Sequence, residues 1–143
     1  MPRYVCDTNC LIATISPWHE HHERTRSELE RRADAGEELR LAAHSIVEAF
    51  AVVTRLPSRH RLKPSDALSL LESNWGQTTL VHLTGREVWN ALRRARTSGV
   101  VGGRTYDLLL AVAALKANAS TILTWNVRHF ELFKDDIDVI TPK

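Results

Sequence analysis

The stretch Val5-Cys6-Asp7-Thr8-Asn9 decides the fold, because an apolar run ends there on polar residues. The run from Arg3 to Cys6 predicts a strand, and residues 8–13 predict a short turn of helix. Four further apolar runs predict strands at residues 39–43, 79–83, 121–125 and 138–141. Because helical patterns separate the strands, we expect an α/β domain with a mainly parallel central sheet of about five strands flanked by helices.

The helical patterns differ in character along the chain. The pattern at residues 18–35 is polar, with a thin apolar stripe that includes Trp18, whereas residues 45–56 are apolar nearly all round and predict a buried helix. Thr84-x-x-Glu87 has the spacing of a capping box, and Gly99 ends the helix that it opens. The remaining helices are expected at residues 64–74 and 105–118.

Composition excludes several classes of protein. The chain has 143 residues, of which 43% are hydrophobic and 25% charged, and this size and balance predict one globular domain over residues 1–143. A net charge of +2 implies no particular partner. The two cysteines, Cys6 and Cys10, cannot build a disulfide framework, so a reducing, cytoplasmic setting is expected. The longest apolar run, residues 108–115, is too short to cross a bilayer, so no membrane role is expected.

Four polar residues stand where a parallel α/β sheet binds its ligands. Asp7 follows the first strand, Asn126 follows the fourth, and Glu48 and Asp107 lie near the starts of helices. Each has an ordinary structural alternative. Asp7 is a possible helix N-cap, Ser45-x-x-Glu48 a possible capping box, Asp107 a favourable first-turn acid, and Asn126 a turn residue.

Convergence of these four residues would define a metal site. Carboxylates that are packed together repel one another unless a cation neutralises them. A ligand set made of oxygen atoms, without His or Cys, suits Mg²⁺ or Mn²⁺. Such an ion supports hydrolysis of a phosphodiester bond, which makes metal-assisted phosphodiester hydrolysis the leading hypothesis.

The chain resembles the PIN-domain nucleases, and within them the VapC-type toxins of type II toxin–antitoxin systems. The resemblance rests on four motifs in order: Asp7-Thr8-Asn9 after the first strand, Glu48 in a helix, the helix start Arg104-Thr105-Tyr106-Asp107, and Thr124-Trp125-Asn126 after a strand. It implies a three-layer PIN-like fold and an endoribonuclease that uses Mg²⁺, with Mn²⁺ as a substitute. It also implies an RNA substrate, a cognate VapB-like antitoxin and a homodimer.

The resemblance also assigns roles to residues. Asp7, Glu48 and Asp107 would be the acidic metal ligands, and Asn126 would complete the catalytic set. The family often has Asp at the fourth position, so Asn126 puts a second metal ion in doubt. Thr124 matches a hydroxyl position of the family and, with Asn9 and Arg104, is a candidate contact to RNA or phosphate.

Two other functions stay open on the sequence. Asn126 allows a PIN fold that binds RNA or protein with weak or no catalysis. A phosphatase with Asp7 as nucleophile is less favoured, because the second acid that such enzymes need would stand at Asn9. Beyond the motifs, the basic loop at residues 55–63 and Trp125 are candidate RNA contacts, and His19, His21 and His22 are expected on an exposed helix face.

Overall fold

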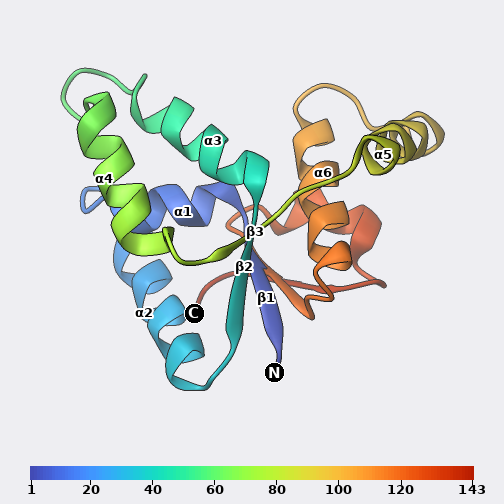
Figure 1. Ribbon diagram of the computed structural model, residues 1–143, viewed down its shortest axis with the longest axis horizontal. Coiled ribbons are helices and arrows are strands. Elements are labelled where there is room, and N and C mark those ends of the chain that lie inside the picture. Colours follow the sequence, from blue (N-terminus) through green and yellow to red (C-terminus); the bar gives the residue numbers. More distant parts are fainter.

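The computed structural model describes residues 1–143 and contains a five-stranded sheet between two layers of helices (Figure 1). The strands are β1 (Arg3–Cys6), β2 (Glu38–Ala42), β3 (Thr79–Val81), β4 (Thr121–Leu123) and β5 (Asp138–Ile140). They run in the order β3-β2-β1-β4-β5, and every neighbouring pair is parallel. The predicted parallel α/β sheet is therefore confirmed, and β1 lies at its centre.

The helices divide between the two faces of the sheet. They are α1 (Thr8–Ile15), α2 (His22–Asp34), α3 (Ala43–Val53), α4 (Pro64–Trp75), α5 (Gly85–Ser98) and α6 (Arg104–Lys116), with a 3₁₀ segment η1 (Val127–Phe133). Figure 1 shows α1 to α4 on one side and α5 and α6 on the other. The two layers follow the chain order, so the first half of the chain covers one face and the second half the other.

Two apolar cores result from the alternation of side chains along each strand. On β1, Val5 packs with α5, α6 and η1, whereas Tyr4 and Cys6 pack with α1, α3 and α4. On β4, Ile122 and Leu123 divide in the same way. Because both faces of the sheet are covered, its central strands are almost entirely apolar.

The predicted polar helix at residues 18–35 starts later than expected. Helix α2 begins at His22, and Trp18 lies in the preceding loop with 46% of its surface exposed. The buried side of α2 consists of His22, Thr25 and Glu28 rather than of the apolar stripe. The expectation of an exposed histidine face is therefore wrong for His22, whose Nδ1 is hydrogen-bonded to the carbonyl of Ala13 at 2.8 Å.

Most of residues 45–56 form a helix as predicted, but the prediction that this helix is buried is wrong. In α3 only Ser45, Ala49 and Val53 are buried, and Val47 is 69% exposed. The capping box of Ser45 and Glu48 does not form, because the helix already begins at Ala43 and Ser45 lies inside its first turn. The Ser45 hydroxyl is buried without a hydrogen-bond partner.

Other local predictions are confirmed. Thr84 and Glu87 form both hydrogen bonds of a capping box, and Gly99 ends α5 in the left-handed conformation (φ 72°) that glycine adopts without strain. Cys6 and Cys10 are buried free thiols. The segment η1 was not predicted. None of the helices combines the length and the apolar character that crossing a bilayer requires.

Candidate active site

A cleft of about 450 Å³ opens at the carboxyl-terminal edge of the sheet, where β1 and β4 end and α3 and α6 begin. All four sequence-predicted catalytic residues line it. The lining also includes Asn9 and Arg104 from the predicted set, and His129, to which the sequence interpretation gave no role. The lining residues are Asp7, Thr8, Asn9, Ile12, Glu48, Val52, Gly103, Arg104, Asp107, Asn126 and His129.

Asp7 is held in place by two hydrogen bonds. It follows β1 directly and caps α1, because its Oδ1 accepts from the Thr8 amide at 2.7 Å. Its Oδ2 accepts from the Thr124 hydroxyl at 2.8 Å, and only 8% of the residue is exposed. The N-cap alternative and the active-site prediction for Asp7 are therefore compatible, since the cap fixes the carboxylate at the floor of the cleft.

Thr124 organises the residues around Asp7. Its hydroxyl oxygen accepts from the backbone amide of Asn126 at 2.9 Å and from the side-chain amide of Asn9 at 3.3 Å. The same hydroxyl donates its proton to Asp7. Asn9 in turn accepts from the backbone amide of Trp125 at 3.2 Å. Thr124 is fully buried behind Asp7, so its hydroxyl positions other site residues and does not face the cleft.

Glu48 and Asp107 reach the cleft from helices on opposite sides of the sheet. Glu48 lies in the middle of α3 and is half-buried, and no hydrogen bond fixes its carboxylate. Asp107 lies in the first turn of α6, with 19% of its side chain exposed. Parallel strand order brings these two helices together at one edge, as the convergence argument requires.

His129 is the functional candidate that sequence reasoning missed. Its Nδ1 lies 3.2 Å from Oδ2 of Asp107, so the imidazole pairs with this carboxylate. The residue lies in η1, directly after the Thr124-Trp125-Asn126 motif. Because η1 was not predicted, no pattern in the sequence indicated that His129 would turn toward Asp107.

The electrostatics of the cleft disfavour its full negative charge. The pKa of Asp7 is raised to about 6, first by burial and then by the nearby charges of Asp107 and Glu48, while the hydrogen bonds from Thr124 and Thr8 act in the opposite direction. Burial also raises the pKa of Asp107, although His129 and Arg104 act in the opposite direction. A cation placed between these carboxylates would relieve both effects.

The chemistry of the donors fits a hard divalent ion. The cleft offers carboxylate oxygens and the amide oxygen of Asn126, without a thiolate, and such donors suit Mg²⁺ or Mn²⁺. No group of three or more His, Cys, Asp or Glu side chains lies close enough together to hold an ion as the side chains stand. Asp7 is held by two hydrogen bonds, whereas no hydrogen bond holds the carboxylate of Glu48.

The sequence matches a known family over most of its length. A model of the PIN domain matches residues 4–133, and the chain therefore belongs to the PIN domain family. Ribonuclease VapC40 of Mycobacterium tuberculosis is 32% identical over 128 residues, which covers 90% of each protein. Ribonuclease VapC27 of the same organism is 30% identical over 118 residues, which covers 82% of this chain and 81% of that protein.

Solved structures share the fold. The VapBC2 complex of Rickettsia felis, bound to a DNA fragment from its promoter, contains a chain that superimposes with a TM-score of 0.68 at 19% identity, and 96% of each chain is covered. At this identity the likeness concerns the fold alone. It agrees with the three-layer arrangement seen in Figure 1.

Proposed function

We propose that this chain is a metal-dependent endoribonuclease of the VapC type, whose activity a cognate antitoxin restrains. One observation carries the proposal: Asp7, Glu48 and Asp107 come from three separate elements and line a single cleft together with Asn126. The buried carboxylate of Asp7, with its raised pKa, supports a cation as the missing partner. The similarity to Ribonuclease VapC40 and Ribonuclease VapC27 supports RNA as the substrate.

The residues of the cleft would have different roles in such an enzyme. Asp7 and Asp107 would hold a Mg²⁺ or Mn²⁺ ion, and Glu48 would join them directly or through a water molecule. When bound, the ion would act as a Lewis acid on the phosphodiester. Asn126 adds an amide oxygen without negative charge, so a single resident ion is the expected arrangement, with any second ion arriving with the RNA.

The remaining polar residues position this set and the substrate. Thr124 fixes the orientation of Asp7 and of the Asn126 backbone through its hydroxyl. Arg104 is exposed at the mouth of the cleft, where its guanidinium can contact a phosphate of the RNA backbone. Asn9 faces the same cleft, and we assign it the same kind of contact.

Two partners follow from the same proposal. An antitoxin of the VapB type is supported by the solved VapBC2 complex, which contains a chain of this fold. A homodimer is proposed on the family resemblance alone. Light scattering of the purified chain, alone and after co-expression with the product of any adjacent short reading frame, tests both partners.

Cleavage of total RNA by the purified chain tests the activity. The reaction is run with Mg²⁺, with Mn²⁺ and with EDTA, beside Asp7→Asn and the matched control Asp138→Asn, whose exposed residue lies at the start of β5 and far from the cleft. We expect discrete fragments that require metal, and a loss of more than about 100-fold in Asp7→Asn, since changes in residues that only support a metal ligand already cost 10–100-fold. Full activity in Asp7→Asn contradicts the site. No cleavage by the folded, partner-free wild type favours a non-catalytic binding module.

A further inference from the structure

A row of stacked rings lies beside the cleft and has no part in the proposed catalytic set. We call it the ring strip; it consists of His60, Trp18, His19, His21, Trp125 and the guanidinium of Arg24. Its members come from the loop between α3 and α4, the loop between α1 and α2, the start of α2, and the segment after β4. Three stretches of the chain, residues 18–24, His60 and Trp125, thus bring these side chains together on the surface.

The rings follow one another closely along the strip. His60 stacks on Trp18 with centroids 4.1 Å apart and planes 19° apart, and His21 stacks on Trp125 at 3.7 Å and 8°. His19 links the two stacked pairs through tilted contacts, 5.7 Å from Trp18 and 5.6 Å from His21. The Arg24 guanidinium lies 5.8 Å from the centre of the Trp125 ring.

One end of the strip is attached to the candidate active site. Trp125 directly precedes Asn126, and its backbone amide donates to the Asn9 side chain at 3.2 Å. Its indole Nε1 donates to the Thr25 hydroxyl at 3.0 Å, which fixes the ring against α2. The first ring of the strip is therefore held rigidly, one residue away from the catalytic set.

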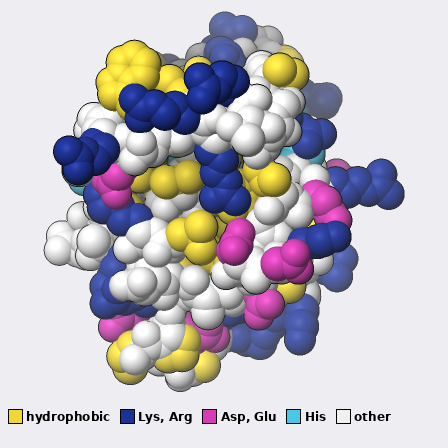
Figure 2. Space-filling model, turned by 90° about the vertical axis from the view of Figure 1, so that its right-hand side faces the viewer, with side chains coloured by type: hydrophobic (Ala, Val, Ile, Leu, Met, Phe, Trp, Pro, Cys, Tyr) yellow, Lys and Arg dark blue, Asp and Glu magenta, His cyan; other side chains and the backbone are white.

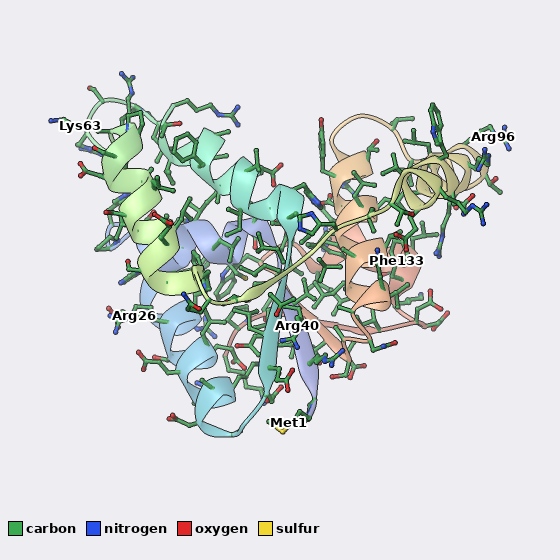
Figure 3. The ribbon with its side chains drawn as sticks, in the orientation of Figure 1. Met1, Arg26, Arg40, Lys63, Arg96 and Phe133 are labelled. Carbon is green, nitrogen blue, oxygen red and sulfur yellow. The ribbon has the colours of Figure 1, made fainter.

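The other end of the strip meets the basic loop between α3 and α4. His60 is followed by Arg61 and preceded by Arg59, both exposed, and Lys63 at the end of the loop points away from the body of the molecule in Figure 3. Two acids lie next to the strip: Glu20 Oε1 is 3.4 Å from Nε2 of His21, and Glu23 Oε1 is 3.9 Å from Nε2 of His22. Both side chains are more than 80% exposed, so solvent screens their charges. The strip thus runs from the cleft to a cluster of cations.

The packing of the core does not account for this arrangement. Trp18 and the three histidines of the strip belong to neither apolar core, and only Trp125 packs against one. Trp18 is 46% exposed, and the side chain of His21 is 30% exposed. Partly exposed aromatic rings beside cations are the chemistry with which proteins bind single-stranded nucleic acid, since a base can stack on a ring, or extend a row of stacked rings, while the cations contact the phosphates.

We propose that the ring strip binds unpaired bases of the RNA strand that enters the cleft. This inference rests on the proposed function, because it extends the same substrate beyond the scissile bond. Bases of a double helix are already stacked on one another, so the strip selects single-stranded segments. Stacking tolerates every base, so the strip contributes affinity and direction along the strand more than sequence preference.

Binding of a short, unstructured, fluorescently labelled oligouridine RNA to the full chain tests the strip. Fluorescence anisotropy in EDTA measures the Kd without metal and without cleavage. We expect Trp18→Ala to raise the Kd about tenfold, which corresponds to one lost base stack, and Trp18→Phe to recover most of the affinity. His60→Ala, at the exposed end of the strip, is a second test with a smaller expected effect.

Trp89 provides a matched control. It is an exposed tryptophan on α5, 62% accessible, and cations also lie near it, since Figure 2 shows hydrophobic side chains beside Lys and Arg at the top of the face that α5 occupies. Unlike Trp18 and Trp125, however, it has no ring stacked on it and belongs to no row of rings that leads to the cleft. Figure 3 places Arg96 of α5 and Lys63 of the basic loop at opposite ends of the molecule. Trp89→Ala is therefore expected to bind RNA with the wild-type Kd, although it removes the same kind of side chain.

Equal Kd values for wild type, Trp18→Ala and His60→Ala overturn the proposal that the strip binds RNA. A loss of affinity in Trp89→Ala as large as that in Trp18→Ala overturns it as well. Thermal unfolding of each variant checks that the Kd values are measured on folded protein. The test of the strip and the test of the proposed function can fail independently of each other. A chain that binds RNA through Trp18 but never cleaves it overturns the nuclease alone, whereas a chain that cleaves RNA with unchanged affinity in Trp18→Ala overturns the strip alone.

Discussion

Asp7 and Asp107 face the same cleft, but the structure holds them in different ways. Asp7 is buried, accepts two hydrogen bonds and belongs to a network that extends through Thr124 to Asn9 and Asn126. Asp107 is more exposed and is paired only with His129, a side chain that is itself 35% exposed. Glu48 is also held loosely, because its carboxylate has no hydrogen-bond partner.

The comparison separates a rigid half of the site from an adaptable half. Strand ends fix the rigid half, because the positions of Asp7 and Thr124 follow from the pairing of β1 with β4. Helix starts carry the adaptable half, and side-chain rotation decides where its carboxylates point. An ion that needs both halves gains orientation from the first and has to order the second, so metal binding and ordering of Glu48 are expected to occur together.

The largest expected effect concerns the buried charge of the rigid half. The pKa of Asp7 is about 6 in the folded chain and near 3.8 when unfolded, so the folded state binds the extra proton. Metal-free stability therefore falls as the pH rises from about 4 to above 6, by about 3 kcal/mol from this carboxyl. Urea unfolding at several pH values measures the fall, and Asp7→Asn should remove most of it. Parallel pH curves for both proteins would contradict the burial argument.

The second effect tests whether the rigid half depends on Thr124. Thr124→Val keeps the shape but removes the donor to Asp7 and the acceptor for the Asn126 amide. We expect cleavage to fall 10–100-fold and the free energy of unfolding to fall by about 2 kcal/mol. Thr124→Ser retains the hydroxyl and serves as the control. Loss of activity in both variants alike would assign the effect to packing rather than to the hydrogen bonds.

The third prediction concerns a carboxylate added to the cleft between the two halves of the site. Asn126→Asp supplies the fourth carboxylate that the family often has, and we expect the affinity for Mn²⁺, measured by calorimetry, to rise about tenfold. Asn90→Asp adds the same charge on the exposed surface of α5 and is expected to leave the affinity unchanged. An unchanged affinity in Asn126→Asp would place the ion away from Asn126.

The smallest effect concerns the adaptable half. His129 lowers the pKa of Asp107, so His129→Gln should raise that pKa and move the acid limb of the pH–rate profile to higher pH. At alkaline pH the loss of rate is expected to be less than about fivefold, because partly exposed ion pairs contribute little. A rate loss that is the same at all pH values would mean that His129 acts in some other way than through Asp107.

The sequence predicted the rigid half better than the adaptable half. Asp7 and Asn126 follow buried strands, and the strand order of a parallel sheet brings such positions together without further information. The role of Glu48 depended on where α3 begins, and the apparent capping box with Ser45 pointed to the wrong start. His129 could not be predicted, because a 3₁₀ segment has no apolar periodicity from which to read its direction.

The fold followed from local patterns, whereas the surface did not. Five strands and six helices were expected at nearly their observed positions, since alternating strands and helices leave few arrangements. The helix that was expected to be fully buried, α3, presents Val47 to solvent, because its neighbours cover only one side of it. The ring strip joins residues 18–24 to His60 and Trp125, which lie far away in the chain, and no spacing within the sequence predicts such a contact.

The hydrogen bond between Asp7 and Thr124 joins the beginning of the chain to a residue close to its end. The two residues stand 117 positions apart in the sequence, so the floor of the cleft exists only once β4 has paired with β1. Separation of these two strands therefore removes the cleft, and no segment shorter than the stretch from β1 to β4 can carry it.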